Sequence, residues 1–211
     1  MIKKAISLLS FVMVFASCSD ADEVLSDKAT KEDSAVFLPK VLEKGPNAVK
    51  EATELNDNKG IIGIYHVPEM LSLTILDSAE YSGIAKKLSA NFRKLVEDAD
   101  LSKAEIDGSG GVIYYNNDPE NFIFECVVPI KEMPKKKPKH SQVVVLEEDK
   151  MIIYNYYGPY ETLNLVYEEV RDYMKLNGLK QSGPMREFYI VDPAIEKDST
   201  KWLTRVMVPV N

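Results

Sequence analysis

The chain has 211 residues, which is enough for one large domain or two small ones. Its 45% hydrophobic and 28% charged residues are typical of soluble globular proteins and exclude a fully disordered, collagenous or multi-span membrane chain. A net charge of -7 repels phosphate backbones and argues against nucleic-acid binding. Two cysteines and two histidines argue against a disulfide framework and structural zinc, so we expect no metal and no cofactor.

The first segment has the pattern of an export signal. Lys3 and Lys4 precede an apolar run over residues 5–15, which is too short to remain as a transmembrane helix. The run ends in Ala16-Ser17-Cys18, which resembles the lipobox of bacterial lipoproteins, although Phe15 replaces the usual leucine. We therefore expect removal of residues 1–17, lipidation of Cys18 and anchoring of an exported protein to a membrane of the bacterial cell envelope. Simple cleavage and a buried thiol are the alternatives.

Residues 18–59 are rich in Asp, Glu, Lys, Ser and Asn, and we interpret them as an acidic, largely flexible tether. One apolar cluster lies within it, at residues 36–42, and Pro39 leaves room there for only a turn or two of helix. The cluster predicts a short segment that docks loosely on the folded body.

Residues 60–211 contain one pattern twice, in halves of about 60–133 and 140–211. Each half closes with an apolar strand that ends in proline, and an earlier strand in each half is followed by Asp-Pro. A further strand precedes the helix of each half, and an upstream segment adds one more. The predicted strands are 61–65, 70–75, 112–115 and 124–130 in the first half, and 142–146, 151–156, 187–191 and 204–210 in the second.

Each half also contains one stretch with helical periodicity. In the first half, Asp77 and Glu80 have the spacing of a capping box at the helix start. In the second half, Pro159 lies near the first helical position and Gly178 just past the end. The predicted apolar faces are Ile84, Leu88, Phe92, Leu95 and Val96, and Leu163, Val166, Tyr167, Val170 and Met174. Two strand-helix-strand-strand units predict an α+β fold with a pseudo-two-fold antiparallel sheet and helices on one side.

The halves are joined by a basic tract, Lys135-Lys136-Lys137-Pro138-Lys139-His140. Like charges in a connecting segment are usually a solvated loop, and we assign the tract to the connector. A nucleic-acid or membrane patch is the alternative.

Several spaced motifs of the second half resemble the GyrI-like effector-binding domain, which forms the ligand-binding part of many AraC- and MerR-type regulators and also occurs alone. The motifs are Tyr157-Gly158-Pro159-Tyr160-Glu161-Thr162-Leu163, Asn177-Gly178-Leu179, Gly183-Pro184, Arg186-Glu187-Phe188-Tyr189, Asp192-Pro193 and Val208-Pro209-Val210. The resemblance implies a duplicated SOUL-like fold whose central cleft holds a small organic ligand, often cationic or aromatic, between aromatic side chains and an acidic residue. Because a signal and a tether precede the domain in place of a helix-turn-helix, we expect no transcription factor.

The resemblance also implies the residues of the site. Glu125 and Glu187 occupy the acidic positions of the two halves, and a structural ion pair is the alternative role for each. Arg205 stands at the repeat position equivalent to Glu125, where it would neutralise a carboxylate or bind an anionic ligand. We predict Tyr156 and Tyr189 as pocket-lining and Tyr167 as core. Trp202 would cap the cleft or cover the sheet edge.

Three functions are compatible with these residues. The first is a membrane-anchored binding protein that holds an aromatic or cationic molecule. The second is a hydrolase of reactive small molecules with a cleft glutamate as general base, a role that a nearby arginine would oppose by lowering the carboxylate pKa. The third is an envelope interaction protein with a vestigial cleft. We predict that His66 and His140 both lie in connecting segments, and neither has an apolar surround that would support haem ligation.

Overall fold

The computed structural model describes residues 49–51 and 58–211. The predicted signal peptide, Cys18 and the apolar cluster at 36–42 lie outside these described residues. Within the described part of the chain, no helix has the length and apolar character needed to cross a membrane.

Nine strands form a single sheet, and all of their pairings are antiparallel except that of β1 with β2. All eight strands expected in residues 60–211 are present, with bounds shifted by a few residues. The strands are β1 (Val49–Glu51), β2 (Gly60–Val67), β3 (Met70–Ala79), β4 (Gly111–Tyr114), β5 (Phe122–Pro129), β6 (Gln142–Leu146), β7 (Asp149–Tyr157), β8 (Met185–Tyr189) and β9 (Leu203–Pro209).

The sheet order shows that the halves exchange strands. It runs β1-β2-β7-β9-β8-β4-β5-β3-β6, so β2 of the first half pairs with β7 of the second, and β6 of the second half pairs with β3 of the first. The two halves also meet at the centre of the sheet, where β4 pairs with β8. The halves are therefore interlocked at three places and form one continuous body.

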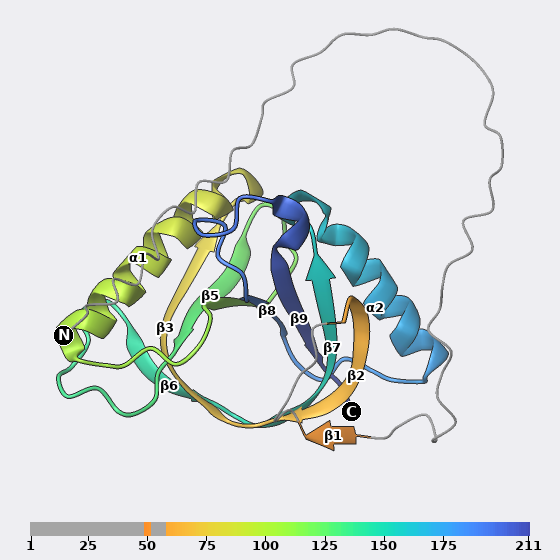
Figure 1. Ribbon diagram of the computed structural model, residues 1–211, viewed down its shortest axis with the longest axis horizontal. Coiled ribbons are helices and arrows are strands. Elements are labelled where there is room, and N and C mark those ends of the chain that lie inside the picture. The colour runs from red at the N-terminus through yellow and green to blue at the C-terminus, as the bar shows by residue number, and fades with distance from the viewer. Residues whose placement is uncertain (1–48, 52–57) are drawn as a thin grey trace, which may run out of the picture.

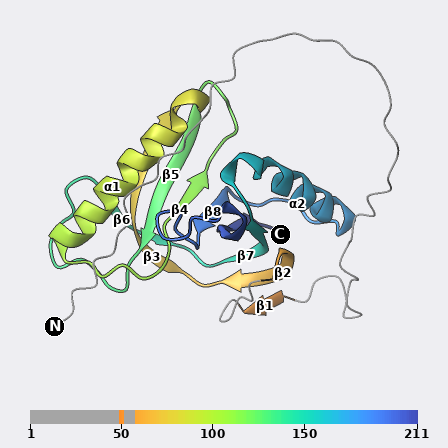
Figure 2. The same cartoon turned by 45° about the horizontal axis from the view of Figure 1, so that its top comes forward.

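Two helices cover one face of the sheet. Helix α1 (Ile84–Ser102) packs on β3 and β5, and α2 (Asn164–Leu176) packs on β7 (Figures 1 and 2). A 3-10 turn precedes each helix, η1 (Tyr81–Gly83) and η2 (Tyr160–Thr162). In the central strands, residues of the core beneath α1 pair directly with residues of the core beneath α2. Directly paired side chains point to the same face of a sheet, so both helices lie on the same face. The predicted α+β fold with a pseudo-two-fold sheet is confirmed.

A third core lies on the opposite face of the sheet. Ile113, Ile153, Phe188 and Met207 belong to it, and they face away from the helices because side chains alternate along each strand. A shallow hollow of about 220 Å³ opens on this side and is lined mainly by apolar side chains together with Arg205. The central strands β4, β7 and β9 thus bury side chains on both faces of the sheet.

Three details differ from the sequence analysis. Asp77 is a residue of β3 and does not cap the helix, because η1 starts only at Tyr81; its carboxylate accepts hydrogen bonds from Lys87 Nζ (2.9 Å) and Asn91 Nδ2 (3.0 Å). His66 is an exposed residue of β2 and does not lie in a connecting segment. The three residues of β1 fall inside the predicted tether, yet they pair in parallel with β2.

Candidate ligand-binding site

Glu187 lies on the pseudo-two-fold axis of the sheet. Cys126 of β5 pairs with Val112 of β4, and Val206 of β9 pairs with Glu187 of β8. Because Cys126 and Val206 occupy the same place in the repeated last strand, Val112 and Glu187 are equivalent positions. They also face each other across the β4–β8 pair. The axis therefore passes between an apolar side chain from one half and a carboxylate from the other, on the face that the helices cover.

The Glu187 carboxylate is buried, with a relative exposure of 2%, and tyrosine hydroxyls surround it. Tyr167 of α2 donates a short hydrogen bond to Oε1, and Tyr189 donates to Oε2 at 3.3 Å. Tyr114 lies near the carboxylate and favours its ionised form. Burial raises the pKa of Glu187 above its ordinary value, and these hydrogen bonds oppose the rise only in part.

Two of these tyrosines are predictable from the internal repeat of the sequence. Tyr114 and Tyr189 each stand two residues after the axis pair Val112 and Glu187, so they are repeat equivalents. Tyr167 has no such signal, because its spacing along α2 is that of a core residue, and its ring does pack on the core beneath α2. Its hydroxyl nevertheless reaches Glu187, which helical periodicity does not predict.

Two equivalent aromatic pairs flank the axis. Tyr81 and Tyr160 each open the 3-10 turn before a helix, and each meets an aromatic residue where the last strand of its half begins: Phe122 is the first residue of β5, and Trp202 directly precedes β9. The ring centroids of Tyr81 and Phe122 are 6.0 Å apart, and those of Tyr160 and Trp202 are 5.3 Å apart in a stacked arrangement. Tyr160 also meets Tyr189 edge-on at 5.4 Å, which connects the second pair to the carboxylate group.

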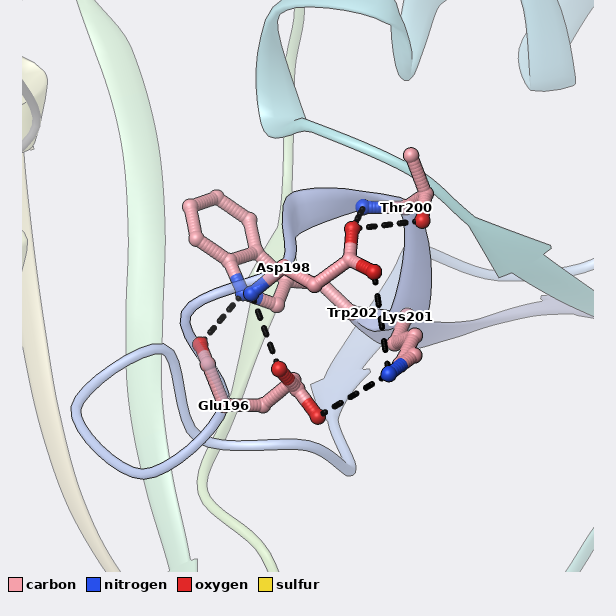
Figure 3. A network of polar contacts seen from close by, with 5 residues as sticks. All are labelled: Glu196, Asp198, Thr200, Lys201 and Trp202. Atoms are coloured by element: carbon pink, nitrogen blue, oxygen red, sulfur yellow. Dashed lines mark hydrogen bonds and ion pairs between the residues drawn. The ribbon is translucent and has the colours of Figure 1, made fainter.

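A polar network holds Trp202 in place (Figure 3). Its indole Nε1 donates to the carbonyl of Glu196 at 2.9 Å, and Asp198 accepts hydrogen bonds from the backbone and hydroxyl of Thr200. Lys201 lies 3.6 Å from Asp198 Oδ2 and 4.0 Å from Glu196 Oε2. The loop presents the indole ring to Tyr160 and leaves it partly exposed.

Glu125 and Arg205 lie on the opposite face from Glu187. Glu125 pairs with Ile113 and Arg205 with Phe188, and both partners belong to the core that faces away from the helices. Glu125 accepts a hydrogen bond from Tyr115 at 2.5 Å, and Arg205 Nε donates to Asn155 Oδ1 at 2.9 Å. The structure thus separates Arg205 from Glu187, since the one-residue step along each strand reverses the side-chain direction.

The hydroxyl of Tyr156 belongs to a local turn. The residue is buried on the helix side, and its hydroxyl donates to the carbonyl of Pro159 at 3.1 Å and makes a short contact with Thr162 Oγ1. Of the six predicted ligand-binding residues, Glu187, Tyr189 and Trp202 are brought together around the axis. Tyr156 supports the turn that carries Tyr160.

Hydrogen bonds, and no basic side chain among the described residues, stabilise the charge of Glu187. Within residues 58–211, no lysine or arginine forms an ion pair with Glu187. Burying a carboxylate without a cationic partner is costly, and a cationic ligand would supply that partner. Aromatic rings around a cation add ~0.5–2 kcal/mol each. The described residues contain no group of three or more His, Cys, Asp or Glu that would hold a metal ion.

Comparisons with solved structures find the same fold at low sequence identity. The C-terminal domain of EcmrR matches with a TM-score of 0.63 and 17% identity, over 71% of this chain and 96% of that one. The chain spans 56% of the longer EcmrR chain solved in complex with DNA. A structure described as a hydrolase from Listeria innocua matches with a TM-score of 0.53 and 14% identity, over 74% of this chain and 94% of that one. SAV2435 bound to tetraphenylphosphonium matches with a TM-score of 0.51 and 18% identity, over 70% and 92%.

A comparison with curated protein sequences finds no match. The model of one protein family, the GyrI-like small molecule binding domain, matches residues 78–211. This match covers more than half of the chain and includes both helices, both aromatic pairs and Glu187. The chain belongs to the GyrI-like small-molecule-binding domain family.

Proposed function

We propose that this protein binds an aromatic organic cation, with Glu187 as the counter-ion. The observation that carries the proposal is a buried carboxylate on the pseudo-two-fold axis, held by tyrosine hydroxyls and without a cationic side-chain partner among the described residues. A cation near this carboxylate would replace hydrogen bonds from tyrosine by a direct charge interaction, which is strong where water is excluded.

The two aromatic pairs favour a ligand that carries rings as well as charge. Tyr160 and Trp202 lie on one side of the axis, and Tyr81 and Phe122 on the other. A cation with at least two aromatic groups would contact both pairs while its charge stays near the midline. Tetraphenylphosphonium, the ligand of SAV2435, has this composition.

Titration with tetraphenylphosphonium tests the proposal. We expect Glu187→Gln to weaken binding at least tenfold, about 1.4 kcal/mol. Glu125→Gln is the matched control, because it removes the same charge from the opposite face, and its affinity should equal that of the unchanged protein. Tetraphenylborate has nearly the same shape with the opposite charge and should not bind. Equal affinity of the Glu187→Gln and unchanged proteins would contradict the proposal.

Glu187 also supports a second candidate function, hydrolysis of an activated small molecule. Its raised pKa suits a general base, and Arg205, which would have opposed this role, lies on the other face of the sheet. Turnover of an activated aryl ester that disappears in Glu187→Gln and persists in Glu125→Gln would favour this function. Binding of tetraphenylphosphonium without any turnover would favour binding alone.

We further propose that the protein is exported and held at a bacterial envelope membrane through a lipid on Cys18. The support is the sequence pattern alone, namely two lysines, an apolar run and small residues before the cysteine. Labelling with a radioactive or alkyne-tagged fatty acid should modify the unchanged protein and spare Cys18→Ser, which should leave the membrane fraction. Equal labelling of both proteins would contradict the lipid site.

A further inference from the structure

The basic connector between the halves has a fixed backbone. Asp98 of α1 is fully buried and accepts hydrogen bonds from the backbone N–H groups of Lys139 (3.1 Å), His140 (2.7 Å) and Ser141 (2.7 Å). The hydroxyl of Ser141 donates to the same carboxylate at 2.7 Å. These bonds attach the tract to the C-terminal part of α1, so it differs from the freely solvated loop that its composition predicts.

The lysine side chains of this tract point outward and carry uncompensated charge. All four are exposed, and none forms an ion pair within residues 58–211. Lys131, just upstream, differs because Glu105 pairs with it. The chain as a whole is acidic, with a net charge of -7, so the tract is a local basic stretch in an acidic protein. The four lysines are Lys135, Lys136, Lys137 and Lys139.

Exposed apolar side chains lie at the same end of the molecule. Met133 is 64% exposed and Leu101, in the last turn of α1, is 50% exposed. Lys136 donates its backbone N–H to the carbonyl of Ser102 at 3.1 Å, which places the tract directly beside this turn. Clustered lysines beside exposed apolar side chains are the combination that binds the surface of an anionic bilayer.

This end lies opposite the candidate ligand-binding site along α1. The 19 residues of the helix separate its two ends by about 28 Å at 1.5 Å per residue. Tyr81 precedes the N-terminal end, near the N-terminal end of α2, while the connector meets the C-terminal end (Figure 1). A surface that bound the connector would leave the aromatic pairs turned away from it.

We propose that the basic connector surface, formed by the four lysines with Met133 and Leu101, docks on anionic lipid headgroups. The exposed lysines supply charge complementarity, the two apolar side chains enter the interface, and the apolar run before Cys18 favours membrane proximity. This proposal does not rest on the ligand, and a failure to bind tetraphenylphosphonium would leave it intact.

Lysine acetylation on vesicles tests the proposal with the full chain. The protein is mixed with vesicles of phosphatidylcholine alone or with added phosphatidylglycerol, and modification of each lysine is followed by mass spectrometry. We expect the tract lysines to react several-fold more slowly on the anionic vesicles only, with the difference lost at high salt. Lys180 is the internal control, because it is exposed elsewhere and should react equally on both.

Two variants separate charge from fold. On anionic vesicles we expect Lys131, just upstream of the tract, to be protected as well. Changing the four tract lysines to glutamine should abolish this protection of Lys131 without lowering the melting temperature. The matched control changes four exposed lysines elsewhere, Lys59, Lys86, Lys94 and Lys180, and should keep that protection. Equal acetylation on neutral and anionic vesicles would overturn the proposal. Protection by duplex DNA or polyglutamate, with none on anionic vesicles, would also overturn it and assign the surface to that partner.

Discussion

The two halves share one backbone plan but differ in chemistry around the axis. The first half places Val112 at the axis, with Leu88 on its helix, whereas the second half places Glu187 and Tyr167 at the corresponding positions. The aromatic pairs, in contrast, occur in both halves. The duplication thus supplies a symmetric aromatic frame, and a few substitutions in one copy supply the charge.

This difference has a physical reason. Two carboxylates facing each other at Val112 and Glu187 would repel strongly in a buried place, and one of them would remain protonated. A single carboxylate with tyrosine donors avoids this repulsion and still presents one negative charge. The asymmetry is therefore what makes a cation site at the axis compatible with a folded sheet.

The largest expected effect concerns the ends of the helices, where the halves also differ. Asp98 in the first half holds the connector, whereas Asn177 closes α2 by donating to the carbonyl of Tyr173 at 2.8 Å. Asp98→Ala would leave three backbone N–H groups without their acceptor, and we expect it to lower the free energy of unfolding by about 3 kcal/mol. Denaturant unfolding measures this change.

Asp100→Ala is the matched control, because its side chain is 84% exposed, and it should change stability by less than about 0.5 kcal/mol. Burial by itself raises the pKa of Asp98, but the hydrogen bonds from Ser141, His140 and Lys139 hold it below its ordinary value of 3.8. The stabilisation is therefore complete above the unfolded pKa and is lost as the pH falls through the folded pKa. An Asp98→Ala penalty that persists undiminished in strong acid would contradict this account.

The second prediction removes the donor that distinguishes the helices. Tyr167→Phe deletes the hydroxyl bonded to Glu187 and resembles the apolar Leu88 of the first half. Because a hydrogen bond to a charged group is lost, we expect a decrease of about 1.5–3 kcal/mol in the free energy of unfolding at neutral pH. Tyr173→Phe, on the same helix, should cost less. If the two variants were equally stable, the Tyr167 hydroxyl would have no special role.

The third prediction removes the negative charge from the axis. Burial raises the pKa of Glu187 in the folded protein. The carboxylate therefore costs no stability below its unfolded pKa, and the loss of stability is complete above its folded pKa. Glu187→Gln should therefore raise the melting temperature at pH 8 by about 2–4 °C, the shift that 1 kcal/mol gives in a domain of this size. The gain should vanish towards pH 4, as differential scanning calorimetry can show. A gain that grows in acid would contradict the assigned direction of the pKa shift.

The smallest expected effect concerns the aromatic pairs. Trp202→Phe makes the second pair resemble the first, and Phe122→Trp does the reverse. Loss of the indole should weaken tetraphenylphosphonium binding by about 2–5-fold, since tryptophan gives the strongest cation–π contact. Phe122→Trp should strengthen binding by a similar factor. Unchanged affinity in both variants would place the ligand away from these pairs.

The sequence predicts the fold well because its signals are local and repeated. Proline-terminated strands, the left-handed Gly178 at φ 64° after α2 and the helical periodicities all agree with the structure. The capping-box spacing at Asp77 was misleading, since the strand continues through that residue. The strand exchange had no local signal, because pairing partners depend on contacts between distant segments.

The site was only partly predictable for a similar reason. Glu187, Tyr189 and Trp202 lie in motifs that the sequence displays, and the structure places them together. Glu125 occupies an equally suggestive motif, but strand register turns its side chain to the other face. A one-residue step decides the face, and sequence spacing between two different strands does not fix that step.

The exchange of β2 and β6 affects how the polypeptide reaches its final state. Ile64 must find Ile152, a partner 88 positions away, before the sheet is closed on that side. Contacts that span so much of the chain delay folding, because the ordering entropy is lost before the contacts form. During synthesis, β3 lacks its outer neighbour until residues 142–146 emerge, and its open edge is then a target for other chains. Coexpression of the two halves as separate polypeptides should consequently yield a stable complex, while either fragment alone should aggregate.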